Sequence, residues 1–170
     1  MNKLLTLIYS LCLFSSHSLY SQTTSKVKQY VIDQSSLSDI DKKIIKEADS
    51  LANNINKNLS NYVRVYDTSV VENNIKNHII YKAYYHSDRK KIVKIIVLGS
   101  SKTQNGTYTF YYFENIPLKV DGEIFDDPPV ALSVYFNSDR HIFPKEIGLT
   151  DAKFVQKMGY DLIDFFKKRY

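Results

Sequence analysis

The sequence contains a single cysteine, no tryptophan, five glycines and four prolines among its 170 residues. One cysteine, Cys12, cannot form a disulfide within the chain, so the fold must be stabilised by packing. The glycines form neither a Walker loop nor a dinucleotide-binding loop, and there is no Gly-x-Ser-x-Gly elbow. These absences exclude a disulfide-rich scaffold and leave nucleotide binding and serine hydrolysis without a sequence motif.

The first residues have the order of an export signal. Lys3 is followed by the apolar run Leu4–Phe14 and then by small and polar residues. This run of about 11 residues is shorter than the roughly 20 that cross a bilayer, so we predict a cleaved signal peptide over residues 1–21 rather than a retained anchor. Leu11 stands where a lipid-attachment site at Cys12 needs a small residue. The protein is therefore expected to be exported and to be periplasmic or secreted.

The charge of the mature chain is modestly positive. Removing Lys3 leaves 22 basic residues against 18 acidic ones, a net charge of +4, and these residues are spread along the chain. The sequence contains no recognisable nucleic-acid-binding module with basic and stacking side chains on one face, so we predict no nucleic-acid partner. We also predict no stable membrane insertion after cleavage. The composition is instead rich in aromatic residues, with 14 tyrosines and 9 phenylalanines, which suit half-buried sheet positions.

Two helices are predicted at the ends of one domain. Residues 22–35 mix Thr, Ser and Lys and are predicted to be a flexible leader into a single α+β domain over residues 36–170. Apolar residues recur every three or four positions between Leu37 and Leu59, which predicts an amphipathic helix. The same period returns after Phe143, with Thr150 as the expected cap of a C-terminal helix.

Between these helices the hydrophobic period falls to two residues, which is typical of strands. The expected strands are Tyr62–Tyr66, Ile79–Tyr85, Lys91–Leu98, Thr107–Phe113, Pro117–Val120 and Val130–Phe136. Their connections are short, so they favour antiparallel hairpins or a meander. The predicted fold is α+β, with an N-terminal amphipathic helix packed on an antiparallel sheet of about five or six strands, plus a C-terminal helix.

An aromatic pair followed by a polar turn recurs in the sheet region, as Tyr84-Tyr85-His86-Ser87-Asp88-Arg89 and Tyr135-Phe136-Asn137-Ser138-Asp139-Arg140. In this region the chain resembles small uncharacterised exported proteins with aromatic Tyr-Tyr/Phe hairpin repeats. It is more distantly similar to MORN repeats, but it lacks their regular glycines, so their binding properties are not carried over. The element order is also similar to cystatin-like and NTF2-like architecture, which implies either a binding module or an enzyme.

The strand Thr107–Phe113 supplies the candidate binding residues. Strict alternation places Tyr108 and Tyr112 on one face and Tyr111 on the other. Exposed rings offer contact area at little entropic cost, so Tyr108, Tyr111 and Tyr112 are the predicted ligand-binding residues. The alternative is that the C-terminal helix covers one of these faces.

Sites for a metal or for catalysis are weakly supported. His78, His86 and His141 remain after export, but none belongs to a pair with metal-ligand spacing. The acidic segment Asp121–Asp127 departs from the EF-hand pattern and is interpreted as a solvated turn. We therefore predict no metal, no cofactor and no catalytic residue.

Two functional hypotheses remain open. The first is an exported, non-enzymatic binding or interaction module with an aromatic antiparallel sheet, whose partner is an unknown protein or small ligand. The second is a small hydrolase or lyase in which residues such as His78, Tyr81, Tyr112 or Asp126 meet in a pocket between sheet and helix.

Overall fold

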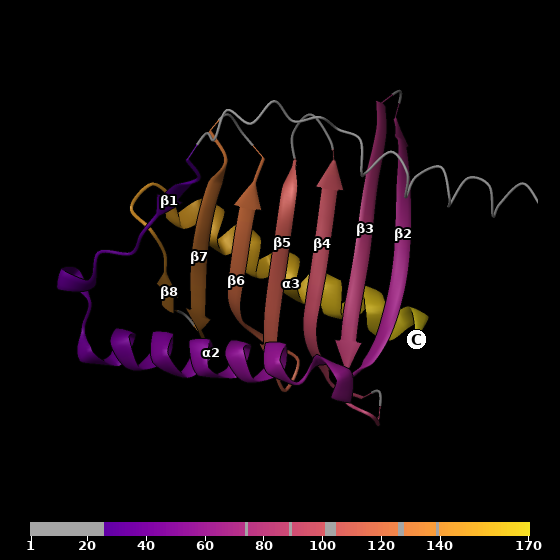
Figure 1. The fold of residues 1–170 in the computed structure, drawn as a ribbon, viewed down its shortest axis with the longest axis horizontal. Coiled ribbons are helices and arrows are strands. Elements are labelled where there is room, and N and C mark those ends of the chain that lie inside the picture. The colour runs from indigo at the N-terminus through magenta and orange to yellow at the C-terminus, as the bar shows by residue number, and fades with distance from the viewer. Residues whose placement is uncertain (1–25, 74, 89, 101–104, 126–127, 139) are drawn as a thin grey trace, which may run out of the picture.

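The computed structural model describes residues 26–170, except for residues 74, 89, 101–104, 126–127 and 139, and contains one large sheet covered by two helices (Figure 1). This arrangement confirms the α+β class. The predicted signal peptide, residues 1–21, lies outside the described residues. The strands are β1 (Lys28–Tyr30), β2 (Val63–Asn73), β3 (Ile75–Tyr85), β4 (Ile92–Ser100), β5 (Gly106–Phe113), β6 (Ile116–Ile124), β7 (Val130–Asn137) and β8 (Arg140–Ile142).

Six of these strands, β2 to β7, form an antiparallel meander in which each strand pairs with the next one along the chain. The sheet order is β1-β7-β6-β5-β4-β3-β2. At the β7 edge, β1 pairs in parallel and β8 pairs in the antiparallel sense. Two short 3₁₀ turns, η1 (Gln34–Ser36) and η2 (Leu59–Asn61), flank the first long helix.

Helix α2 (Asp39–Lys57) crosses one face of the sheet near one end of the strands (Figure 1). Its start is fixed by a capping box, in which the Asp41 amide donates to Ser38 Oγ at 3.2 Å and the Ser38 amide donates to the Asp41 carboxylate at 3.2 Å. The side that faces the sheet is buried and consists of Ile44, Ala48, Ala52 and Ile55. The helix predicted over Leu37–Leu59 is thus present and packs on the sheet.

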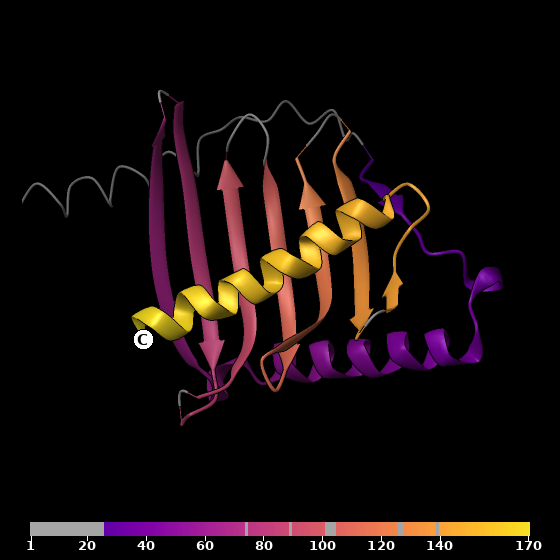
Figure 2. The ribbon, with the colours of Figure 1, turned by 180° about the vertical axis from the view of Figure 1, so that it is seen from behind.

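Helix α3 (Leu149–Arg169) runs diagonally across the opposite face (Figure 2). The main core lies between α3 and the sheet. It includes the fully buried Phe110, Tyr112, Phe136 and Phe166. At Gly159 a Cβ atom would lie 3.0 Å from Pro117 Cβ, so this glycine lets the helix approach β6 closely. The N-cap of α3 is Gly148 rather than the expected Thr150.

The sheet differs from the predicted one in three respects. It has eight strands within the described residues rather than about five or six, and α2 follows β1 instead of opening the fold. The segment 22–35, predicted as a leader, contains β1, whose Lys28 amide donates to the Pro129 carbonyl at 2.7 Å. β6 continues past Val120, so Asp121 and Glu123 lie in a strand and not in a turn.

Candidate functional site: a polar groove on the uncovered part of the sheet

Alternating tyrosine and lysine side chains form a row across the sheet beneath α2. The row is in register over five strands, from β3 to β7, and consists of Tyr84, Lys94, Tyr111, Lys119 and Tyr135. Lys94 Nζ lies 5.9 and 5.3 Å from the centroids of its two neighbouring rings, and Lys119 Nζ lies 5.8 and 5.5 Å from its two. Each ammonium therefore makes cation–π contacts on both sides.

Helix α2 supplies polar partners to this row at one-heptad spacing. Asp49 Oδ1 accepts a hydrogen bond from the Tyr135 hydroxyl at 2.9 Å and lies 3.0 Å from Lys119 Nζ. Asn56 Oδ1 accepts a hydrogen bond from Lys94 Nζ at 2.6 Å, and its amide donates to the Tyr111 hydroxyl at 3.0 Å.

The seven-residue spacing of Asp49 and Asn56 along α2 matches the distance between alternate strands of the sheet. Seven helical residues advance the chain by about 10.5 Å, while two strand spacings span about 9.6 Å. Asp49 and Asn56 therefore reach equivalent positions over β7 and β5, the strands of their tyrosine partners. Helix α2 is consequently fixed in its position along the row by side-chain hydrogen bonds as well as by apolar packing.

The two lysines have opposite electrostatic environments. Burial lowers the pKa of Lys94, and the charge of Asp121 only partly offsets this effect. Burial also acts to lower the pKa of Lys119, but the Asp121 charge and the hydrogen bonds to Asp49 and Asp121 outweigh it and raise that pKa above its usual value. Lys119 thus stays charged and holds two carboxylates in place.

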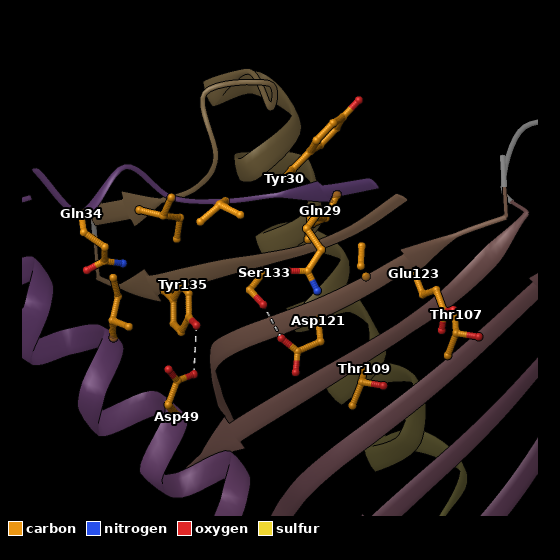
Figure 3. Close-up of a pocket in the computed structure, with 16 residues that line it drawn as sticks. Gln29, Tyr30, Gln34, Asp49, Thr107, Thr109, Asp121, Glu123, Ser133 and Tyr135 are labelled. Atoms are coloured by element: carbon orange, nitrogen blue, oxygen red, sulfur yellow. Dashed lines mark hydrogen bonds between the residues drawn. The ribbon is translucent and has the colours of Figure 1, made fainter. Parts of the chain in front are cut away.

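An open groove lies on the same sheet face, next to α2 (Figure 3). Its volume is about 500 Å³. Strands β5, β6 and β7 form the floor, α2 forms one wall, and the segment from β1 to η1 forms the other. The side chain of Gln29 points into the groove, whereas the ring of Tyr30 points away from it (Figure 3). The groove is therefore formed by segments that are far apart in the sequence.

The groove is lined by hydrogen-bonding groups with an excess of negative charge. Asp121 accepts a hydrogen bond from the Ser133 hydroxyl at 2.7 Å and lies 3.0 Å from Lys119 Nζ. Asp49 and Glu123 also line the groove, together with the hydroxyl-bearing Thr107 and Thr109. The exposed Glu123 side chain has no hydrogen-bond or ion-pair partner among the described residues. Asp49 and Asp121 share one lysine and Glu123 has no cationic partner among the described residues, so the groove can accept positively charged and hydrogen-bond-donating groups.

The predicted binding tyrosines do not share one surface. Tyr112 is buried under α3, where its hydroxyl donates to the Gly159 carbonyl at 3.2 Å. Tyr111 is buried under α2 on the opposite face. Tyr108 is half-buried on the α3 side, where it lines an apolar crevice of about 200 Å³ beside Phe154. The C-terminal helix, the expected alternative cover for one of these faces, lies over Tyr112.

Of the residues suggested for an enzymatic pocket, Tyr81 and Tyr112 are described with their side chains. Tyr81 packs against Phe165 of α3, with ring centroids 5.5 Å apart. Tyr112 lies in the core, His78 belongs to β3, and Asp126 is outside the described residues. Tyr81 and Tyr112 thus both pack in the main core on the α3 side of the sheet.

The other two histidines have separate structural neighbours. His86 packs edge-on against Tyr62, with ring centroids 5.4 Å apart, and His141 shares a 2.9 Å hydrogen bond with Gln156. Among the described residues, no group of three or more His, Cys, Asp or Glu side chains has the geometry to hold a metal ion. Within the same residues, neither helix has the length and hydrophobicity required to span a bilayer.

The sequence reasoning missed the groove residues Asp49, Asp121, Glu123 and Ser133. The interpretation of Asp121–Asp127 as a turn ended the strand too early. Lys119, Asp121 and Glu123 alternate with less polar residues, a period-2 polar stripe that could have indicated one face of a strand. Asp49 carried no comparable signal, because a charged residue on an amphipathic helix ordinarily faces water.

Comparisons with known proteins identify no relative of this chain. The chain matches no protein-family model, and neither a curated protein nor a solved structure is significantly similar to it. The groove must therefore be interpreted from its own geometry and chemistry.

Proposed function

We propose that the protein is an exported, non-enzymatic binding module that holds a small polar ligand in the groove. The ligand carries an ammonium or guanidinium group that faces Asp121, Asp49 and Glu123. The observation that carries this proposal is a preformed groove of about 500 Å³ in which Asp49 and Asp121 share a single lysine and a third carboxylate, Glu123, has no ion-pair partner among the described residues. Such a site offers charge-assisted hydrogen bonds to a cation.

The groove is suited to binding because its polar groups are held in place before a ligand arrives. Lys119 and Ser133 both contact Asp121, and Lys119 and Tyr135 both contact Asp49. Because these carboxylates are already ordered, less side-chain conformational entropy is lost when a ligand binds. The hydroxyls of Thr107 and Thr109 can then add hydrogen bonds that select ligands by shape.

The ligand class is tested with matched probes. Cadaverine carries two ammonium groups, and 1,5-pentanediol is a neutral molecule of the same length. We expect cadaverine to raise the melting temperature of the mature protein, by a few degrees when its concentration is about 100 times the Kd, and pentanediol to leave it unchanged. The shift should shrink in Asp121→Asn and persist in Glu146→Gln, which alters an exposed acid outside the groove. Equal shifts with both probes would refute the cation site.

Export is tested separately, since it rests on the predicted signal peptide. Intact-mass measurement of the protein from the periplasmic or secreted fraction should give a new N-terminus between His17 and Thr23. A full-length chain retained in the membrane would contradict export with cleavage.

A further inference from the structure

The uncovered part of the same sheet face changes character from one edge to the other. At the β2–β4 side, the exposed Tyr66 ring lies between two cations, with Arg64 Cζ at 5.1 Å and Lys82 Nζ at 5.4 Å from its centroid. Ile80 and Leu98, which pair across β3 and β4, are exposed beside them. This group of five residues, the basic patch, presents positive charge next to apolar surface.

Among the described residues, the basic patch contains no acidic side chain. Neither Arg64 nor Lys82 forms an ion pair with a carboxylate among the described residues. Asp67, the acidic residue nearest in sequence, is instead engaged by Arg169 of α3. The Lys82 ammonium contacts the tyrosines Tyr66 and Tyr84, and neither cation of the patch is neutralised by a carboxylate in the described part of the chain, so both can face an anionic group of a ligand.

The patch and the groove lie on one line across the sheet. Lys82 pairs with Ile96, Ile96 pairs with Thr109, and Thr109 pairs with Asp121, so all four side chains share one face and one row. Three strand spacings separate Lys82 from Asp121, which places their backbone positions about 14 Å apart. Apolar and hydroxyl side chains occupy the intervening positions.

We propose that the ligand is a short zwitterionic peptide that lies across the strands. Its amino terminus faces Asp121 and Glu123, its carboxylate faces Lys82 and Arg64, and its apolar side chains contact Leu98 and Ile80. About four extended residues span the roughly 14 Å between these two backbone positions. This inference rests on the proposed cation site in the groove and adds an anion site at the opposite end.

The experiment uses one tetrapeptide, Ala-Leu-Leu-Ala, with its ends either free or blocked. Isothermal titration of the mature protein should give the tightest binding with both ends free. Acetylation of the amino terminus and amidation of the carboxylate should each weaken binding about fivefold, as expected for a partly exposed charge pair. The free peptide lacks any other charge, so each block reports on one end.

Variants assign each end to its site. Asp121→Asn should reduce the effect of acetylation and leave the effect of amidation unchanged, whereas Lys82→Gln should do the reverse. Arg64→Gln is the second variant of the basic patch, and Lys153→Gln, on the exposed side of α3, is the matched control that should bind like wild type. Circular dichroism melts establish that each variant is folded.

The outcomes separate the two proposals. If acetylation weakens binding and amidation does not, the cation site stands and the peptide inference is overturned. If neither block matters, both proposals fail. If the free peptide does not bind and the protein instead forms salt-sensitive dimers in sedimentation, the two charged regions pair between copies of the chain, and the peptide inference is again overturned.

Discussion

Replacing Lys119 with methionine tests whether the shared lysine connects α2 to the sheet. The Lys119 side chain is 12% exposed, and it lies 3.0 Å from both Asp49, which is 40% exposed, and Asp121, which is 37% exposed. Methionine retains an unbranched chain that can pack between the rings of Tyr111 and Tyr135. The variant therefore removes the charge with little loss of packing.

The expected cost follows from burial. Breaking a buried ion pair costs about 3–5 kcal/mol, and breaking an exposed pair costs about 0–1 kcal/mol. Because the lysine is mostly buried but both carboxylates remain partly in water, we expect Lys119→Met to lower the free energy of unfolding by about 2 kcal/mol. Lys91→Met is the matched control, since Lys91 lies only 2.7 Å from Glu114 but both side chains are about half exposed, at 44% and 50%. We expect the control to cost about 0.5 kcal/mol or less, despite its shorter contact.

Urea denaturation at pH 7 measures both losses, provided that the m-value stays unchanged. Repeating the measurement in about 1 M NaCl, where the Debye length is about 3 Å, should remove the cost of Lys91→Met and preserve most of the cost of Lys119→Met. If the two variants lose equal stability, or if salt removes both losses, the shared lysine contributes no more than a surface ion pair and the argument from burial is wrong.

Three further predictions concern the core and the tyrosines. Ile44→Asp places an unpaired charge under α2 and should cost several kcal/mol in urea denaturation; a melting temperature close to that of wild type would mean that α2 is peripheral. Gly159→Leu would force its Cβ to 3.0 Å from Pro117 and should cost about 2–3 kcal/mol by the same assay, whereas an unchanged midpoint would show that α3 can shift freely. Burial raises the pKa values of Tyr85 and Tyr135 to about 12. The folded state therefore retains protons that the unfolded chain loses near pH 10, so stability should fall between about pH 10 and 12, and equal urea midpoints at pH 8 and 11 would contradict this.

Much of the fold could be predicted because its signals are local. The helix expected over Leu37–Leu59 is α2, and the expected strands Ile79–Tyr85, Thr107–Phe113 and Val130–Phe136 lie within β3, β5 and β7. Capping residues and hydrophobic period act within a few positions of each other, so they can be recognised without knowledge of the tertiary contacts.

The short edge strands could not be predicted in the same way. β1 and β8 have three residues each, and both are strands because β7 offers them hydrogen-bond partners. β1 and β7 are about 100 positions apart, since Lys28 pairs with Val130. A segment of this length has no recognisable period, so only the assembled sheet determines its conformation.

The sequence by itself determined the alternation of faces, and the tertiary structure decided what each face does. The alternation places Tyr111 opposite Tyr112, as the structure shows, but both helices have apolar stripes and either could have covered either face. The carboxylates of the groove come from α2 and β6, and they meet because α2 lies along the tyrosine–lysine row at the spacing of alternate strands. Local propensity fixes the period of each element, whereas the position of a functional side chain depends on packing between elements that the sequence places more than 60 residues apart.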